Sequence, residues 1–430
     1  MYIPDIENQS PEEIKRYQEK KLKELLPYLE EHSIFYKDMF ASNNIDITKI
    51  ETLEDLTSIP VTTKDDLQMR SDDFLCVERQ KIIDYVTTSG TLGEPVTFAM
   101  TDNDLNRLAY NEQISFACAG VTQKDTFQLM VTMDKRFMAG LAYYLGLRKL
   151  GAGILRVGPG MQELQFESIR RYNPTGLVTV PSFIPKLIDY ADQHNIDFKS
   201  TSIKKAVCIG EPIRNNDFTL NTLGRKIADK WDIKLYSTYA STEMGTAFTE
   251  CDAGRGGHHH PEMIIVEFLD DNNQPVAEDE PGEVTITTLG VEAMPLLRFK
   301  TGDICYHHSE PCSCGRNTIR LGPVIGRKQQ MLKFKGTTLF PPAIYDVLNE
   351  IECIENYVIE VFTNELGTDE ILIKAGCGSK APVSIKTIKD HFRAKLRVAP
   401  EIEFFDKKEI LKLQFPSGNR KPITFIDKRN

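Results

Sequence analysis

The sequence predicts an α/β protein with a large N-terminal domain of α/β layers, which includes a β-rich subdomain, and a small α+β C-terminal domain. Two patterns support this prediction. Strand-like and helical runs alternate in the middle of the chain, which is typical of α/β architecture. Short strands separated by turns then follow between residues 263 and 297. A chain of 430 residues is also too long for one small core, so we expect at least two domains.

The first expected element is an amphipathic helix. Ser10, Pro11 and Glu13 have the N-cap, N1 and N3 pattern of a capping box. Apolar residues then recur at roughly helical spacing: Ile14, Tyr17, Leu22, Leu25, Leu26 and Leu29. We expect this helix to pack on the main domain and Pro27 to kink it or end it early.

The α/β pattern comes next along the chain. Strands are expected at residues 82–86, 176–180 and 205–209, and a helix at residues 185–193. The β-rich subdomain covers about residues 245–320, with turn signals at residues 270–273 and 278–282.

A domain boundary is expected at Arg327, which divides the chain into residues 1–326 and 327–430. The second part is large enough to form a small α+β domain. Its expected helices are residues 342–349 and 383–395.

Composition excludes several classes of protein. The net charge is −10 and the two signs are interspersed, which argues against nucleic acid or an anionic membrane as a partner. No segment has the apolar length needed to span a bilayer, and residues 1–7 lack the basic start and apolar run of a signal peptide. The nine cysteines are mostly isolated, which suits a reducing compartment. We therefore expect a cytoplasmic protein.

A loop rich in hydroxyls and glycine directly follows the first expected strand. Residues 87–95 read Thr-Thr-Ser-Gly-Thr-Leu-Gly-Glu-Pro. Glycines let the backbone approach a ligand closely, and consecutive N–H groups can form a concave anion site. The hydroxyls of Thr88, Ser89 and Thr91 add donors for phosphate oxygens. No Gly-Lys-Ser/Thr ending follows, so this is not a Walker P-loop. Read alone, the loop is explained as well by a turn between two strands.

Four later motifs supply further polar groups, although a turn, a capped helix or a basic tail explains each one alone. Residues 236–243 end in Glu243, a carboxylate that can ligate Mg²⁺. Asp303 follows a glycine turn and can accept both hydroxyls of a ribose. Arg327, at the expected boundary, can hold phosphate or ribose oxygens. Lys421, in a loop near the C-terminus, can stabilise charge that develops on an α-phosphate.

A metal site is expected in the β-rich subdomain. Cys251 is followed by three consecutive histidines at 258–260, and Cys312 and Cys314 form a Cys-x-Cys pair before a glycine. Three thiolates and one imidazole make a closed tetrahedral set, which is common for structural zinc. The competing ligands are Cys305, His307 and His308, and the alternative is a set of reduced, unliganded cysteines.

In this order, the motifs resemble those of the adenylate-forming superfamily of acyl-CoA synthetases, luciferases and peptide-synthetase adenylation domains. The resemblance runs from about Tyr85 to Asp427. Within the superfamily, the chain is most similar to the phenylacetate–coenzyme A ligase family. The similarity lies in Gly210-Glu211-Pro212, in the Cys-Ser-Cys-Gly-Arg run at 312–316 and in the Gly-Thr-Thr-Leu-Phe-Pro-Pro run at 336–342.

This resemblance implies an AMP-forming acid–CoA ligase. A small-molecule carboxylate, expected to be an aryl-acetic acid, attacks the ATP α-phosphate, and the coenzyme A thiol then displaces AMP from the acyl-adenylate. The implied cofactors are ATP/AMP, coenzyme A, Mg²⁺ and a structural Zn²⁺. The small C-terminal domain is expected to be mobile and to rotate between the two steps.

The resemblance also assigns roles to single residues. The catalytic residues are Lys421, Glu243 (through Mg²⁺) and Thr88. The phosphate-binding residues are Thr88, Ser89, Gly90, Thr91 and Gly93, the adenine is framed by Gly210, Glu211, Pro212, Tyr239 and Ala240, and the same nucleotide site includes Ser241, Thr242, Asp303 and Arg327. Zinc is assigned to Cys251, His258, Cys312 and Cys314, with His258 chosen over its neighbours by its spacing to Glu267.

Two other classes of function stay open. The first is an adenylate-forming enzyme that passes the acyl group to a carrier protein or an amine. The second is a non-catalytic nucleotide-binding or zinc-stabilised interaction protein. We expect small-molecule partners, no nucleic acid and no membrane, and a homodimer.

Overall fold

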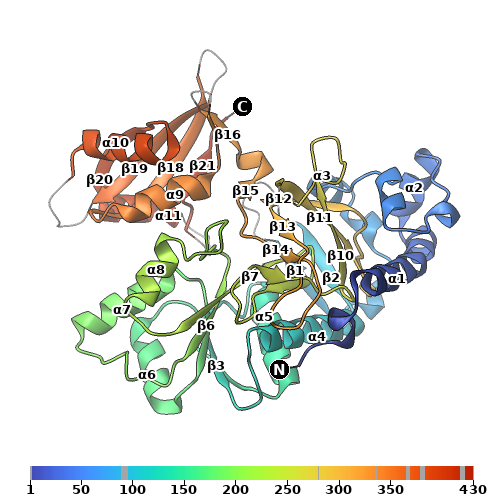
Figure 1. Cartoon of the computed structure of the whole chain (residues 1–430), viewed down its shortest axis with the longest axis horizontal. Coiled ribbons are helices and arrows are strands. Elements are labelled where there is room, and N and C mark those ends of the chain that lie inside the picture. Colours follow the sequence, from blue (N-terminus) through green and yellow to red (C-terminus); the bar gives the residue numbers. More distant parts are fainter. Residues whose placement is uncertain are drawn as a thin grey trace. The chain divides into compact units, whose positions relative to one another are not determined.

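The computed structural model describes residues 2–88, 95–278, 280–334, 337–364, 369–377, 383–416 and 422–429. The chain forms two compact units, Met1–Val324 and Ile325–Asn430, which are drawn in Figure 1. The division falls two residues before the boundary expected at Arg327.

The first unit is built on a large sheet that is parallel in one half and antiparallel in the other. Its strand order is β13-β14-β9-β8-β7-β6-β5-β3-β4. Strands β4, β3, β5, β6 and β7 pair in parallel, and β8, β9, β14 and β13 continue antiparallel. The bounds are β3 (Thr126–Leu129), β4 (Gly153–Arg156), β5 (Gly176–Thr179), β6 (Lys205–Ile209), β7 (Lys234–Ser241), β8 (Thr246–Thr249), β9 (Gly257–His258), β13 (His307–His308) and β14 (Arg320–Leu321).

Helices cover both faces of the parallel part of the sheet, because the strands carry apolar side chains on both faces. On β6, Ala206 and Cys208 join one core cluster while Val207 and Ile209 join another. The first cluster includes residues of α6, α7 and α8, and the second includes residues of α4 and α5. The helices are α4 (Asp102–Cys118), α5 (Met138–Leu150), α6 (Gln162–Tyr172), α7 (Phe183–Gln193) and α8 (Thr222–Ala228).

A second, antiparallel group of strands forms the β-rich part. Strand β11 pairs with β10 on one side and with β12 on the other, and β1 and β2 form a hairpin-like pair. The bounds are β1 (Asp84–Thr87), β2 (Thr97–Met100), β10 (Ile264–Leu269), β11 (Gly282–Thr288) and β12 (Phe299–Cys305). The expected β-rich subdomain thus corresponds to real strands.

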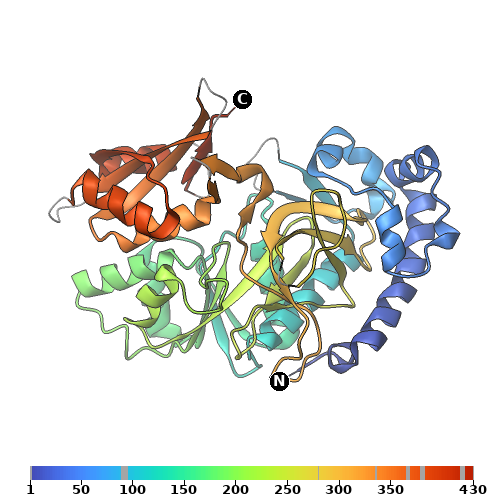
Figure 2. The ribbon, with the colours of Figure 1, turned by 45° about the horizontal axis from the view of Figure 1, so that its top comes forward.

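The N-terminal helices α1 (Pro11–His32), α2 (Ile34–Ser42) and α3 (Lys64–Met69) lie along this β-rich part, as Figures 1 and 2 show. The capping box at Ser10 and Glu13 forms as expected. Helix α1 continues through Pro27 to His32, so the expectation that Pro27 ends the helix early was wrong. The face with Leu22, Leu26 and Leu29 is buried in the main core, and burial outweighs the hydrogen bond that a proline removes. Short 3₁₀ segments are η1 (Asp5–Asn8), η2 (Ile47–Lys49), η3 (Glu54–Ser58), η4 (Ser71–Phe74) and η5 (Arg79–Lys81).

The second unit has its own sheet and core. Its sheet order is β20-β19-β18-β21, with a separate β16–β17 pair. The core contains Phe334, Ile359 and Phe392, all of which are fully buried. The elements are β15 (Gly326–Arg327), η6 (Lys328–Gln330), β16 (Leu332–Phe334), β17 (Thr337–Leu339), α9 (Pro341–Glu350), β18 (Ile354–Thr363), β19 (Asp369–Cys377), α10 (Ile385–Leu396), β20 (Glu401–Asp406), α11 (Lys407–Gln414) and β21 (Phe425–Asp427). The predicted fold class is therefore confirmed.

Candidate active site and metal centre

Two predicted motifs meet at the carboxyl edge of the parallel strands. Ile209, the last residue of β6, pairs with Thr238 of β7. Gly210, the residue after β6, therefore lies beside Tyr239 of β7, at the sheet edge where α/β proteins bind ligands. Gly210 has φ +73°, so it lets the chain turn sharply away from β6.

The chain turns back directly after the second motif. Ala240 and Ser241 end β7, Thr242 and Glu243 lie in the turn, and β8 returns antiparallel. The Ser241 hydroxyl accepts a hydrogen bond from the N–H of Met244 at 3.3 Å, which closes this turn. The alternative of a strand followed by a capped helix was wrong for this segment. Glu243 is half-buried in the turn.

Asp303 is brought to Tyr239 from strand β12, 64 residues further along the chain. The hydroxyl of Tyr239 donates to Oδ2 of Asp303 at 2.9 Å. Burial, and then the charge of Asp303, raise the pKa of Tyr239 well above its ordinary value, so Tyr239 remains a neutral donor. This hydrogen bond joins the end of β7 to the β-rich part and places a carboxylate beside the motif that was expected to frame an adenine.

Glu211 has a structural partner that the sequence did not reveal. Its two carboxylate oxygens accept from the N–H and the hydroxyl of Ser182, each at 3.0 Å. Ser182 is the residue before α7. The carboxylate therefore anchors the start of α7.

Thr88 closes the base of the loop expected to bind phosphate. Its N–H donates to the carbonyl of Val96, and its hydroxyl accepts from the N–H of Val96, both at 3.0 Å. Thr88 is buried. The predicted residues Ser89, Gly90, Thr91 and Gly93 lie outside the described residues, as does Lys421.

Arg327 belongs to the second unit, where it ends the short strand β15 and is half-buried.

Arg107 of α4 is a residue that the sequence analysis missed. Its guanidinium donates to the carbonyl of Gly245 at 2.8 Å, two residues after Glu243. The side chains of Arg107 and Glu243 both line a cavity of about 40 Å³. The sequence does not predict this contact, because polar residues are common within helices.

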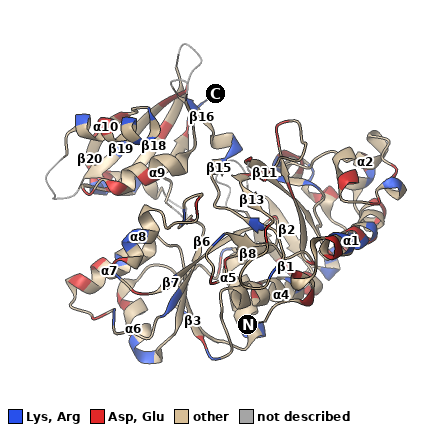
Figure 3. Ribbon diagram, in the orientation of Figure 1, with Lys and Arg blue, Asp and Glu red and all other residues tan. Residues whose placement is uncertain are grey.

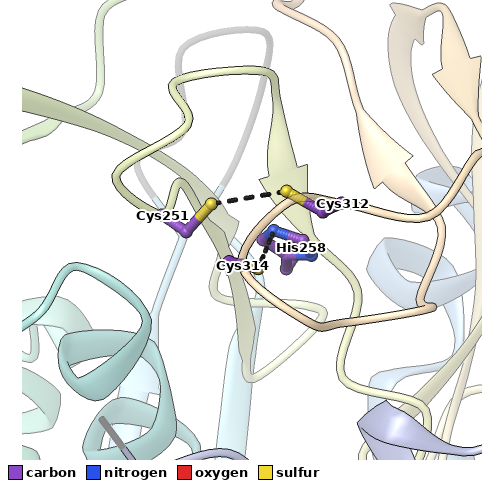
Figure 4. Close-up of side chains that lie close together, drawn as sticks. All are labelled: Cys251, His258, Cys312 and Cys314. Atoms are coloured by element: carbon purple, nitrogen blue, oxygen red, sulfur yellow. Dashed lines mark hydrogen bonds between the residues drawn. The ribbon is translucent and has the colours of Figure 1, made fainter.

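The four predicted zinc ligands come together. The Sγ atoms of Cys251, Cys312 and Cys314 and a ring nitrogen of His258 all lie within 4.8 Å of one another. Figure 4 shows their side chains pointing toward a common centre from three separate segments. Sγ of Cys251 lies 3.6 Å from Sγ of Cys312, and Sγ of Cys314 lies 3.5 Å from Nε2 of His258. The competitors Cys305, His307 and His308 are not in the group that the described residues form.

The neighbouring histidines have other partners. His259 hydrogen-bonds the carbonyl of Ile264 at 2.6 Å, and His260 contacts the carboxylate of Glu7. Nδ1 of His258 lies 3.2 Å from the hydroxyl of Thr318, which orients the ring so that Nε2 faces the cysteines.

The Cys312–Cys314 segment is a tight knuckle. The N–H of Gly315 donates to the carbonyl of Cys312, and the N–H of Cys312 donates to the carbonyl of Arg316, both at 2.9 Å. Gly315 has φ +94°, a conformation that only glycine adopts without strain. Hydrogen bonding to His258 lowers the pKa of Cys312. The hydrogen bond between Cys251 and Cys314 lowers the pKa of Cys314 and raises that of Cys251.

Charge is mixed over the described residues, as Figure 3 shows. Acidic and basic residues are interspersed along the helices and loops of both units. In the part of the chain that the structure describes, no helix is both long and apolar enough to cross a membrane.

Comparison with known proteins identifies the class to which this fold and site belong. Residues 41–293 match the model of the AMP-binding enzyme family. This is more than half of the chain, and the chain therefore belongs to the AMP-binding enzyme family. The predicted membership of the adenylate-forming superfamily is confirmed.

Two of the relatives of this chain are both named phenylacetate-coenzyme A ligase. The chain is 29% identical over 367 residues to phenylacetate-coenzyme A ligase of Thermus thermophilus, a match that covers 84% of this chain and 81% of the relative. It is 27% identical to phenylacetate-coenzyme A ligase of Escherichia coli, with 84% and 82% covered. Among solved structures, 2-hydroxyisobutyryl-CoA ligase in the postadenylation state has the same fold, with a TM-score of 0.84, 20% identity and coverage of 99% of this chain and 94% of that one.

Proposed function

We propose that this protein is an AMP-forming acid–CoA ligase whose acid is of the aryl-acetic class. Its relatives named phenylacetate-coenzyme A ligase match 84% of the chain, including the segments that hold Glu243, Asp303 and the metal group, and this observation carries the proposal. The hydrogen bond between Tyr239 and Asp303 supports a nucleotide site at the carboxyl edge of β6 and β7.

The reaction has two balanced steps. A carboxylate oxygen of the acid attacks the α-phosphorus of ATP, the bond to the β-phosphate oxygen breaks, and diphosphate leaves. The sulfur of coenzyme A then attacks the acyl carbon, the bond to the AMP oxygen breaks, and AMP leaves as the thiol loses its proton. Both steps need aligned reactants and stabilised oxyanions more than a strong base.

In this proposal the residues around the β7–β8 turn bind and orient the nucleotide. Asp303 accepts the ribose hydroxyls, and Tyr239 both holds Asp303 and borders the adenine with Gly210, Pro212 and Ala240. Thr88 sets the ends of the loop that holds the β- and γ-phosphates, and Glu243 is the carboxylate that would ligate Mg²⁺. A bound Mg²⁺ supplies charge neutralisation for the phosphates. Lys421 is proposed to stabilise the charge on the α-phosphate, as in the enzymes that this chain resembles.

We also propose that Cys251, His258, Cys312 and Cys314 bind a structural Zn²⁺. The support is the chemistry of the donor set, three sulfurs and one imidazole within 4.8 Å, with the second nitrogen of His258 already hydrogen-bonded by Thr318. Four protein ligands fill a tetrahedron, so such a site leaves no position for substrate. Its role would be to join the segment around β9 to the knuckle at residues 312–316.

The proposal is tested by exchange of labelled diphosphate into ATP with a panel of acids, followed by thioester formation with coenzyme A. We expect aryl-acetic acids to support both activities. Glu243→Gln should lower the exchange rate strongly, and Lys421→Ala should lower it by about 10²–10³, the usual loss when one group that stabilises an oxyanion is removed. Lys412→Ala, on the exposed side of α11, is the control and should leave the rate unchanged.

Two results would contradict the proposal in different ways. Exchange without any coenzyme A thioester would indicate a carrier protein or an amine as the acyl acceptor. An absence of exchange with every acid, together with no effect of Lys421→Ala, would indicate a non-catalytic nucleotide-binding protein.

A further inference from the structure

Arg107 is a half-buried cation on α4 to which the proposed reaction assigns no role. Its Nε donates to the carbonyl of Leu289 at 2.7 Å, and Nη1 donates to the carbonyl of Gly245 at 2.8 Å. Its Nη2 donates to the hydroxyl of Thr246 at 3.2 Å and to the carbonyl of Met263 at 2.5 Å. Each of the three guanidinium nitrogens therefore donates at least one hydrogen bond.

The partners of Arg107 are unusual for a half-buried charge. Within the residues that the structure describes, every acceptor of its hydrogen bonds is a neutral oxygen. Asp104 contributes an opposite charge, but its oxygens accept from the N–H groups of Thr101, Glu292 and Ala293. Burial lowers the pKa of Arg107 to about 10, so it is still protonated at neutral pH. A guanidinium whose three nitrogens all donate to main-chain and hydroxyl oxygens holds backbone in place.

The backbone that Arg107 holds comes from three segments. Gly245 and Thr246 lie in and after the β7–β8 turn, Met263 precedes β10, and Leu289 follows β11. The planar fork has fixed donor directions, so one side chain sets the position of the turn against the β-rich part.

The turn in question carries Glu243. Gly245 has φ +53°, and a Cβ on it would lie 3.3 Å from Nη1 of Arg107. Arg107, Thr242, Glu243 and Gly245 line the same small cavity. The turn is thus closed from within by Ser241 and fixed from outside by Arg107.

We propose that Arg107 is a positioning residue that fixes the Ser241–Gly245 turn so that the Glu243 carboxylate is held ready for the metal–nucleotide. The inference rests on the proposed function, because it takes Glu243 as the Mg²⁺ ligand. Arg107 itself touches neither metal nor nucleotide and acts through the turn.

Arg107→Lys is the first test, because lysine keeps the charge and loses the fork. We expect the Mg²⁺ concentration for half-maximal diphosphate exchange to rise at least about tenfold, as is usual when a partner that orients a metal ligand is lost. The KM for the acid should stay within about twofold, because the turn is not expected to hold the acid. Gly245→Ala strains the same turn from its other end and should give the same profile.

The matched control is Arg298→Lys. Arg298 is buried and hydrogen-bonded to Glu267 and to the carbonyl of Ile59, so it holds other segments than the β7–β8 turn. The Arg298→Lys variant should have a changed melting temperature and an unchanged Mg²⁺ dependence of diphosphate exchange. In a Glu243→Gln background, Arg107→Lys should add little, because residues that act through one group are not additive.

The outcomes separate this inference from the proposed function. If wild-type exchange is present and Arg107→Lys shifts the Mg²⁺ dependence no more than Arg298→Lys does, the role of Arg107 is wrong and the function stands. If exchange is absent with all acids, calorimetry of Mg²⁺–ATP binding takes its place. Weaker Mg²⁺-dependent binding by Arg107→Lys then supports the positioning role without the ligase activity, and equal binding overturns it.

Discussion

At the scale of single residues, burial changes the protonation state that the residue type alone would predict. Glu112 of α4 is 5% exposed, and its only hydrogen-bond donor among the described residues is the amide of Asn111, at 3.1 Å. Burial raises the pKa of Glu112 to about 8. The carboxyl is therefore protonated at neutral pH, and α4 packs against α5 without a charge between them.

This carboxyl predicts a pH dependence of stability. A pKa of about 8 in the folded state and an ordinary value of 4.5 when unfolded mean that the folded state binds more protons between these two values. The contribution of Glu112 to stability is full below about pH 4.5 and is lost as the pH rises toward 8. Glu112→Gln, which mimics the protonated form, should have a melting temperature close to wild type at pH 5 and above wild type at pH 8.

The exposed Glu12→Gln on α1 is the control and should show no such pH-dependent difference. Thermal unfolding followed by circular dichroism at the two pH values measures both variants. A difference between Glu112→Gln and wild type that is the same at pH 5 and pH 8 would contradict the raised pKa.

At the scale of elements, the four proposed zinc ligands Cys251, His258, Cys312 and Cys314 (the metal group) come from segments that have little regular structure of their own. Strand β9 is two residues long, and the knuckle at residues 312–316 contains no helix or strand. The N-terminal segment docks on the same region, because Nε of Arg316 donates to the buried carboxylate of Glu7 at 2.6 Å and Nη1 of Arg316 lies 3.5 Å from Sγ of Cys314. Segments with few apolar contacts need such cross-links to stay ordered.

Zinc content and stability should therefore change together. We expect about one zinc per chain in the purified full-length protein, and Cys312→Ser should lose most of it and lower the melting temperature by roughly 5 °C or more. Protease cleavage in the N-terminal segment should become faster. Metal analysis, calorimetry and timed proteolysis measure the three effects.

Cys76→Ser is the control for this experiment, since Cys76 is buried outside the metal group. It should keep full zinc content. Wild-type protein with almost no zinc, or Cys312→Ser with unchanged zinc, would reject the site.

At the scale of the whole molecule, the chain has two units with separate cores. Trp231, the one tryptophan of the sequence, is buried in the first unit against Phe198. Phe392 is fully buried in the core of the second unit. Because each unit has its own hydrophobic core, each is expected to unfold as its own cooperative step.

Phe392→Ala tests this independence. Removing a buried aromatic ring costs about 3–5 kcal/mol, so the transition of the second unit should move to lower urea concentration. Tryptophan fluorescence, which reports the first unit, should keep its midpoint, while circular dichroism should show the shifted part. If both signals move together by the same amount, the two units unfold as one.

Much of the fold could be predicted because it depends on local patterns. Strand β6 was predicted with its exact bounds, and the expected helix at residues 383–395 corresponds to α10, because an apolar run and a helix cap are recognisable from neighbouring residues. The early end expected at Pro27 was wrong, because the burial of α1 against the core outweighs a local preference.

The sequence by itself determined the fold class, the order of the motifs and which side chains were proposed as zinc ligands, since these depend on residue identity and on spacing along the chain. Only the tertiary structure decided which groups meet. In the structure Tyr239 donates a hydrogen bond to Asp303, and Ser182 donates to Glu211. Of the three consecutive histidines, only His258 lies with the cysteines. Arg107 donates to Gly245 in the turn that contains Glu243. The reason is physical: a hydrogen bond across tens of residues depends on how sheets and helices pack, and a local pattern does not record that packing.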